Sequence, residues 1–186
     1  MTKETQKKQK IGTAKKLDIL ENQANIVYLS IGSNLGNRIK NIEKTKFYLQ
    51  KYNIYIVNCS SYYESLSWPN INLPKYINIV IKVKTKNDPV ELFKTLKLIE
   101  KKLGRKNDVK NAPRTCDIDI LDFNKKKIYI TLKNIDNLQI PHPRLHERNF
   151  VLVPFHEICP NWKHPKFNQN IVNLLLKLTK SELTTI

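Results

Sequence analysis

Segments with the two-residue side-chain period of a β-strand alternate along this chain with segments that have the 3.6-residue period of a helix. A chain of this kind buries its strands and helices against each other in layers. Because some strands also follow one another without a helix between them, the order predicts a layered α+β domain. The expected elements are, in chain order, a strand over about Ile26–Ile31, a helix over about Asn37–Lys51, a strand over about Ile54–Tyr63, an irregular stretch over Glu64–Lys75, a strand over Tyr76–Val83, a helix over about Pro89–Leu103, strands over Cys116–Phe123 and Lys127–Thr131, and helices that begin near Glu147 and near Asn170.

The helix expected over Pro89–Leu103 has the best-marked ends. Asp88 is a good N-cap, Pro89 suits the first helical position, and Gly104 suits the C-terminal stop. This helix has an apolar stripe, which places Lys97 and Glu100 toward its other side. The stripe is formed by Leu92, Phe93, Leu96, Ile99 and Leu103.

Length and composition predict one domain over residues 25–186, preceded by a tail. The chain has 186 residues, and single domains commonly run to roughly 100–200 residues. It holds only 4 glycines, and no repeat or low-complexity linker divides it. Residues 1–24 carry few large apolar side chains and many lysines, so burial there would not offset the ordering entropy. We therefore expect a mobile basic tail over residues 1–24.

The net charge of +17 attracts phosphate groups, whether these belong to a nucleic acid or to a nucleotide. The lysines are spread along the whole chain, with one local concentration in the tail. We interpret this charge as a general drift in composition and expect no specific nucleic-acid partner. A basic nucleic-acid-binding domain is the alternative reading of the same feature.

Other features of the composition concern location and partners. The three cysteines Cys59, Cys116 and Cys159 are widely scattered, which indicates neither a disulfide framework nor a zinc site. No run of about 18 apolar residues is present, and the N-terminus lacks the apolar stretch of a secretory signal. We expect a cytoplasmic protein without a membrane partner. The absence of an obvious apolar interface stripe favours a monomer.

The sharpest chemical signal is an Asp-x-Asp pair on an expected strand. Because side chains alternate along a strand, Asp117 and Asp119 project from one face, while Ile118 and Ile120 point toward the core. Two neighbouring carboxylates repel each other unless a cation lies between them, and hard oxygen ligands suit Mg²⁺ carried by a nucleotide. A solvated acidic face would give the same pattern. Arg114, just upstream, favours polyphosphate recognition.

The segment Lys110–Leu121, with Pro-Arg followed by Asp-x-Asp, resembles the signature of the hydroxymethyldihydropterin pyrophosphokinase family. Further segments resemble the motifs of that family in the same order, and the resemblance covers about Ile26–Pro160. These segments are Ile31–Gly36, Tyr63–Ser65, Tyr76–Asn78, Ile99–Glu100, Gly104–Arg105, Pro141–Arg144 and Arg148–Phe150.

The resemblance implies a fold and a reaction. The fold would be a ferredoxin-like layered domain, with a largely antiparallel sheet flanked by helices. The reaction would transfer pyrophosphate from ATP to 6-hydroxymethyl-7,8-dihydropterin in folate biosynthesis, giving AMP and the pterin diphosphate. Two Mg²⁺ ions would enter with ATP as co-substrate. The alternative within the family is a non-catalytic relative that keeps the pocket as a binding module.

The resemblance also implies roles for individual residues. Asp117 and Asp119 would bind the metal ions, and Arg105 and Arg114 would be catalytic. The residues implied in ATP binding are Lys97, Glu100, Lys110, Ile120, Gln139, His142 and Arg148. The residues implied in pterin binding are Ser65, Leu66, Trp68, Tyr76, Asn78 and Phe150. Many relatives carry an aromatic residue where Asn111 and Ala112 precede Pro113, so a stacking contact is expected to be missing.

Overall fold

The centre of the fold is a long antiparallel ladder between β1 and β4, which pair from Asn25 opposite Thr85 to Ser33 opposite Ile77. The structure is a computed structural model that describes residues 24–67, 70–105, 112–131, 137–178 and 183–186. The main sheet has the order β5-β1-β4-β3-β8, and β2 also pairs with β4. Its strands are β1 (Asn25–Ser33), β2 (Tyr55–Cys59), β3 (Tyr63–Ser65), β4 (Tyr76–Thr85), β5 (Asp117–Phe123) and β8 (Leu183–Thr185).

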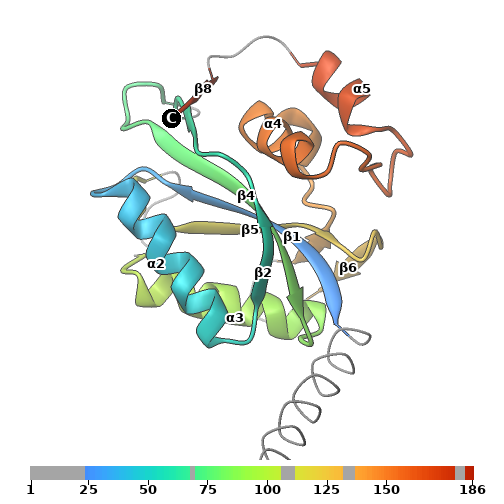
Figure 1. The fold of residues 1–186 in the computed structure, drawn as a ribbon, viewed down its shortest axis with the longest axis horizontal. Helices are drawn as coiled ribbons and strands as arrows, with labels where there is room; N and C mark the ends of the chain where they lie inside the picture. Colours follow the sequence, from blue (N-terminus) through green and yellow to red (C-terminus); the bar gives the residue numbers. More distant parts are fainter. Residues whose placement is uncertain (1–23, 68–69, 106–111, 132–136, 179–182) are drawn as a thin grey trace, which may run out of the picture.

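Helices cover both faces of this sheet (Figure 1). One face packs against α2 (Arg38–Lys51) and α3 (Pro89–Lys102), and the other against α4 (Asn149–Ile158) and α5 (Ile171–Leu176). The order strand–helix–strand, then strand–helix–strand, with β5, β1, β4 and β2 side by side, is the ferredoxin-like arrangement. The predicted α+β class and antiparallel sheet are confirmed. The remaining described elements are β6 (Ile128–Ile130), β7 (Leu138–Ile140) and the 3-10 turn η1 (Leu145–Glu147).

The ends of α3 are confirmed, but its buried side is wider than the apolar stripe predicted. Asp88 accepts hydrogen bonds from the backbone of Val90 and Glu91, and Gly104 has a φ of +86° just beyond the helix. Glu100 was expected on the opposite side of the helix, yet it is 1% exposed. Its carboxylate accepts a hydrogen bond of 2.7 Å from the backbone N–H of Ile118 in β5. A carboxylate with a hydrogen-bond partner can thus be buried at a position where the spacing of apolar residues predicts exposure to solvent.

The strand expected over Ile54–Tyr63 is two strands, because the chain leaves the ladder at Ser60. At this point the backbone N–H of Val80 in β4 donates to the Ser60 hydroxyl at 3.0 Å. In a continuous ladder, this N–H would donate to a backbone carbonyl of the neighbouring strand instead. Glu64, expected in an irregular stretch, belongs to β3.

The sequence also did not predict β7 and β8, which have three residues each and are too short to show a period. The tail expected over residues 1–24 lies, except for its last residue, outside the described residues.

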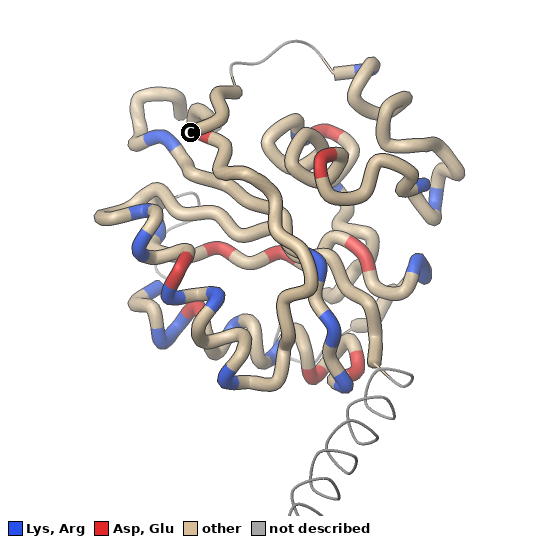
Figure 2. Tube along the Cα trace, in the orientation of Figure 1, with Lys and Arg blue, Asp and Glu red and all other residues tan. Residues whose placement is uncertain are grey.

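The two faces of the sheet have separate cores. Ile77, Ile79 and Ile81 of β4 pack with α2 and α3, as their alternation predicted. On the other face, Tyr28, Val80 and Leu121 pack against α4 and the turn after it, where Phe155 and Trp162 are fully buried. The basic residues are distributed over α2, α3 and β4, whereas β5, the edge strand next to β1, carries acidic ones (Figure 2). Within the described part of the chain, no helix is both long and apolar enough to cross a membrane.

We expect the stability of this second core to depend on pH through His164, which is 2% exposed and contacts the rings of Trp162, His146 and Phe167. Burial, together with His146 and Lys166, lowers the pKa of His164 to about 4. The unfolded chain takes up the proton near pH 6.5. The free energy of unfolding should therefore fall by about 1–2 kcal/mol as the pH drops from 6.5 toward 4, and this contribution is complete above 6.5.

Urea titrations of the wild type and of His164→Gln at several pH values measure this effect. The variant should lose most of the slope between pH 6.5 and 4. The variant His156→Gln in α4 is a matched control outside the cluster and should keep the wild-type slope. Equal slopes in the wild type and His164→Gln would exclude His164 as the source.

Candidate active site

One face of the neighbouring strands β5, β1 and β4 changes from apolar to polar along its length. Next to α4 this face carries Tyr28, Val80 and Leu121. Further along the same face, β1 and β5 place Ser30 opposite Asp119 and Gly32 opposite Asp117, and Gly32 is also opposite Asn78 of β4. The alternation of side chains therefore gathers two carboxylates and an amide beyond the end of the apolar core.

These polar side chains line a cavity of about 560 Å³. This volume is within the usual range for small-molecule sites. Asp117 and Asp119 both line it, so the predicted placement of the two carboxylates on one face is confirmed. The implied site residues that line this cavity are Ser65, Leu66, Tyr76, Asn78, Arg114, Asp117, Asp119, Arg148 and Phe150.

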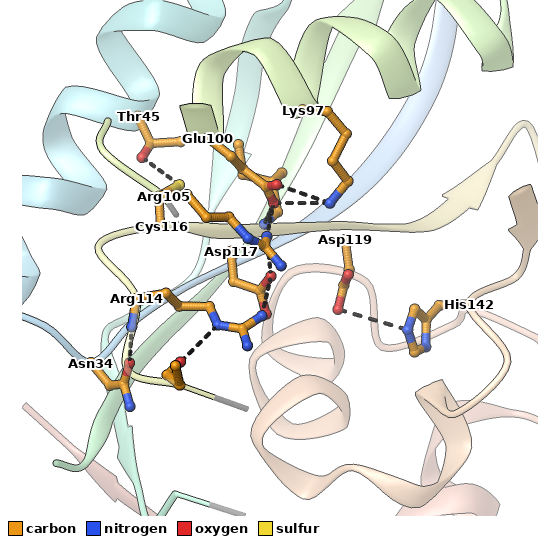
Figure 3. A network of polar contacts seen from close by, with 12 residues as sticks. Asn34, Thr45, Lys97, Glu100, Arg105, Arg114, Cys116, Asp117, Asp119 and His142 are labelled. Carbon is orange, nitrogen blue, oxygen red and sulfur yellow. Dashed lines mark hydrogen bonds and ion pairs between the residues drawn. The ribbon is translucent and has the colours of Figure 1, made fainter. Parts of the chain in front are cut away.

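The two carboxylates are held by different cations (Figure 3). Asp117 accepts hydrogen bonds from Arg105 at 2.6 Å and from Arg114 at 3.3 Å. Asp119 accepts one from Arg148 at 3.1 Å, and the Nε2 atom of His142 is 3.7 Å away from its carboxylate. Burial raises the pKa of Asp119, but His142 and Arg148 outweigh burial and hold this pKa below its usual value. Asp119 is therefore ionised near neutral pH.

Glu100 of α3 holds the Arg105 guanidinium by an ion pair (Figure 3). The Arg105 guanidinium lies 2.6 Å from the carboxylate of Glu100 and 2.6 Å from that of Asp117, so it bridges α3 and β5. Lys97 is paired with Glu100 at 3.0 Å. Burial raises the pKa of Glu100, while Lys97 and Arg105 oppose this shift. In the described structure the carboxylate of Glu100 thus faces protein groups, and it fixes the position of an arginine at the cavity edge.

Among the described residues, Ile120 and Gln139 are two implied residues that do not line the cavity. Ile120 is 5% exposed and packs in the core on the opposite face. Gln139 is opposite Tyr129 in the β6–β7 hairpin. Trp68 and Lys110 lie outside the described residues. Cys116 is fully buried, with its sulfur 3.1 Å from the Thr45 hydroxyl, as a small core residue should be.

Several lining residues were not among those the sequence singled out as site residues. Ser30 and Gly32 share their face with the aspartates only because β1 pairs with β5. A single sequence does not reveal which strands pair. Arg144 belongs to a motif that was recognised, but no role was given to it. The lining residues that were missed are Ser30, Gly32, Ser67, Ile71, Leu73, Arg144, Glu147 and Asn149.

The donor set at this cavity fits Mg²⁺ that arrives with a ligand. Asp117 and Asp119 provide carboxylate oxygens at the cavity wall. Among the described residues, no group of three or more His, Cys, Asp or Glu side chains forms a complete metal site. Mg²⁺ commonly uses one or two carboxylates together with water and phosphate oxygens. The surrounding arginines suit those phosphates.

Fold and cavity together define a class of protein: a ferredoxin-like α+β domain with an acidic, arginine-flanked pocket suited to a metal–polyphosphate complex. Comparison with known proteins narrows this class to one family. Residues 28–160 match the family described as 7,8-dihydro-6-hydroxymethylpterin-pyrophosphokinase (HPPK). This chain belongs to the HPPK family, as its ordered motifs predicted.

Individual relatives agree with this assignment. The 2-amino-4-hydroxy-6-hydroxymethyldihydropteridine pyrophosphokinase of Aquifex aeolicus is 40% identical over 143 residues, which cover 77% of this chain and 86% of that protein. The folic acid synthesis protein of Dictyostelium discoideum is 38% identical over 83% of this chain, but the match spans only 22% of its length. The structure of Plasmodium falciparum HPPK-DHPS has the same fold, with a TM-score of 0.67 at 20% identity, over 83% of this chain and 44% of that one.

Proposed function

We propose that this protein transfers pyrophosphate from ATP to 6-hydroxymethyl-7,8-dihydropterin, giving AMP and the pterin diphosphate in folate biosynthesis. Membership of the HPPK family supports this proposal, as does the name of the Aquifex relative, whose length is mostly covered. The single observation that carries it is the cavity wall where Asp117 and Asp119 are flanked by three arginines and a histidine.

In this proposal, Asp117 and Asp119 would hold the two Mg²⁺ ions that enter with ATP. Bound Mg²⁺ supplies neutralisation of the phosphate charge. Arg105 and Arg114 then move from pairing with Asp117 to pairing with the phosphates, since both guanidiniums already lie at its carboxylate. Arg148 is placed beside Asp119 for the same purpose. Burial lowers the pKa of His142, so this side chain offers a neutral imidazole there. Guanidiniums held this close to the phosphates stabilise the charge of the transition state.

The pterin is proposed to occupy the part of the cavity between β3, β4 and the start of α4. Tyr76 and Phe150 supply aromatic faces for a flat ring, and Leu66 is at the rim. The Asn78 amide nitrogen donates to the Ser65 hydroxyl at 2.9 Å, which fixes the orientation of a buried amide. A fixed amide suits the polar edge of a heterocycle.

The reaction forms one bond and breaks one. The hydroxymethyl oxygen of the pterin attacks the β-phosphorus of ATP, and the bond from that phosphorus to the bridging oxygen of the α-phosphate breaks. AMP leaves with the electron pair, and the hydroxyl proton is released. Positioning and charge neutralisation are sufficient for phosphoryl transfer of this type, so we assign no general base.

The decisive test measures AMP release from ATP and Mg²⁺ with and without the dihydropterin alcohol. We expect AMP only when both substrates are present. Failure of the wild type to release AMP, despite binding both substrates in calorimetry, would favour the non-catalytic relative. Tight, steeply salt-dependent binding to nucleic acid, without AMP release, would favour the alternative basic domain.

We expect Gly32→Ala to weaken pterin binding selectively. A β-carbon at Gly32 would meet the Asn78 side-chain oxygen at 3.0 Å and a ring carbon of Tyr76 at 3.4 Å. The substitution should therefore raise the KM for the pterin by about tenfold or more, because it displaces the two side chains at the proposed pterin site. The KM for ATP serves as the internal control and should change less than twofold. An equal rise in both constants would argue against a pterin site at this position.

We further propose that residues 25–186 act as a single domain, because segments from β1 to α4 line one cavity. The monomer remains the prediction made from the sequence. A cytoplasmic location stays a prediction. Relatives from Arabidopsis thaliana and Pisum sativum are named as mitochondrial, so members of the family differ in location.

A further inference from the structure

Asn34, the residue that follows β1, uses its side chain to join two separate segments of the cavity wall. It is 1% exposed. Its amide oxygen accepts a 2.7 Å hydrogen bond from the backbone N–H of Arg114, and its own backbone N–H donates to the Arg114 carbonyl at 3.1 Å. Figure 3 shows Asn34 beside Arg114, whose side chain extends toward Asp117. Asn34 thus holds the backbone of a proposed catalytic residue by a reciprocal pair of bonds.

The amide nitrogen of Asn34 reaches the other segment. It donates to the Pro74 carbonyl at 3.2 Å and to the Ser67 hydroxyl at 3.3 Å, and that hydroxyl donates to the same carbonyl at 2.6 Å. Ser67 is 2% exposed, so this cluster is removed from competing water. The segment between Ser67 and Pro74 contributes Ile71 and Leu73 to the cavity.

The chemistry of the amide explains why asparagine stands here. One side chain must accept from Arg114 and donate twice on the other side. A carboxylate of the same size accepts but cannot donate, and a hydroxyl is too short and has one proton. Asn34 also belongs to the Ile31–Gly36 segment, one of the ordered family motifs, and the proposed chemistry gives Asn34 no role.

We infer that Asn34 is a positioning residue that couples the pterin side of the cavity to Arg114, so that the two substrates are held in register. This inference rests on the proposed function. Asn34 does not line the cavity and acts through the two segments that it joins. A change at Asn34 therefore affects two kinetic constants through two separate sets of hydrogen bonds.

Two substitutions separate the two sets of bonds. Asn34→Ala removes both, and should lower kcat by about 30-fold or more and raise the KM for the pterin. Asn34→Asp keeps the acceptor for Arg114 but loses both donors, so it should raise the pterin KM while lowering kcat by a much smaller factor. Asn41→Ala is a matched control, because Asn41 bonds to Ser33 and Leu35 of the same turn and to neither segment. It should keep both constants within about twofold.

A double-mutant cycle tests whether Asn34 acts through Arg114. If it does, Asn34→Ala should lower kcat by less than about threefold in the Arg114→Ala background. Full additivity of the two kcat losses would overturn the inference, as would equal kinetics for Asn34→Ala and Asn41→Ala. Thermal unfolding of each variant separates these effects from loss of the folded state.

Amide hydrogen exchange tests the same inference without measuring catalysis. Asn34→Ala should accelerate exchange at Arg114 and also in residues 70–76, whereas Asn41→Ala should accelerate neither. Acceleration of only one segment would overturn the coupling. If the wild type releases no AMP while Asn34→Ala shows both accelerations, the proposed function alone is refuted and the joining role of Asn34 stays in place.

Discussion

Asp119→Asn is expected to lower kcat/KM for AMP formation by at least about 10³-fold. The substitution removes one of the two anionic groups proposed to hold Mg²⁺. It also leaves Arg148 and His142 beside a neutral amide, so that the balance of charge at the cavity wall shifts by one unit. The rate should be measured over a range of Mg²⁺ concentrations. The residual activity should require a higher Mg²⁺ concentration for half-maximal rate than the wild type does.

Asp122, three residues further along the same strand, provides a matched control. Asp122 is 1% exposed, does not line the cavity, and has a pKa that burial raises, so a neutral amide of the same shape should be tolerated there. Asp122→Asn should stay within about threefold of the wild-type rate. If Asp119→Asn and Asp122→Asn had similar rates, the role proposed for the Asp117 and Asp119 pair would be lost.

Glu100→Ala is expected to cause the largest loss of stability, about 2–4 kcal/mol in the free energy of unfolding. The substitution leaves the buried N–H of Ile118 without its acceptor and removes one of the two carboxylates that hold Arg105. Breaking a buried ion pair by removing one partner costs this much because the other partner stays desolvated. Urea denaturation monitored by tryptophan fluorescence measures the difference.

Glu91→Ala provides the comparison within the same helix. Glu91 caps the exposed start of α3 through the backbone N–H of Asp88, so its loss should cost about 0.5–1 kcal/mol. Activity should separate the two variants further, since only Glu100→Ala frees Arg105 from its anchor. If the two variants were equally stable, the carboxylate of Glu100 would not be a structural support.

The features that a single sequence could predict are those that local rules determine. The capping residues gave the ends of α3, and the strand period placed Asp117 and Asp119 on one face. Family motifs in a fixed order then identified most of the cavity lining. None of these inferences needs to know which strands are neighbours.

The features that were missed depend on tertiary neighbours. Ser30 and Gly32 become part of the cavity because β1 is placed between β4 and β5. Glu100 is buried because Ile118, Lys97 and Arg105 converge on it, and a hydrophobic period contains no information on such partners. The break at Ser60 has the same origin, since a hydroxyl there pairs with Val80 across the ladder.

The transition from apolar core to polar cavity along one sheet face has a consequence for inhibitor resistance. Asp117, Gly32 and Asn78 form one row across the neighbouring strands β5, β1 and β4, so a change at any of them alters the proposed metal and pterin contacts directly. Leu66 and Ile71 at the rim are 36% and 65% exposed, and neither is proposed to hold the metal ions or the polar edge of the pterin. Escape from a compound that occupies this cavity is therefore confined to the rim, and a compound that contacts only the strand row leaves the chain few viable routes to resistance.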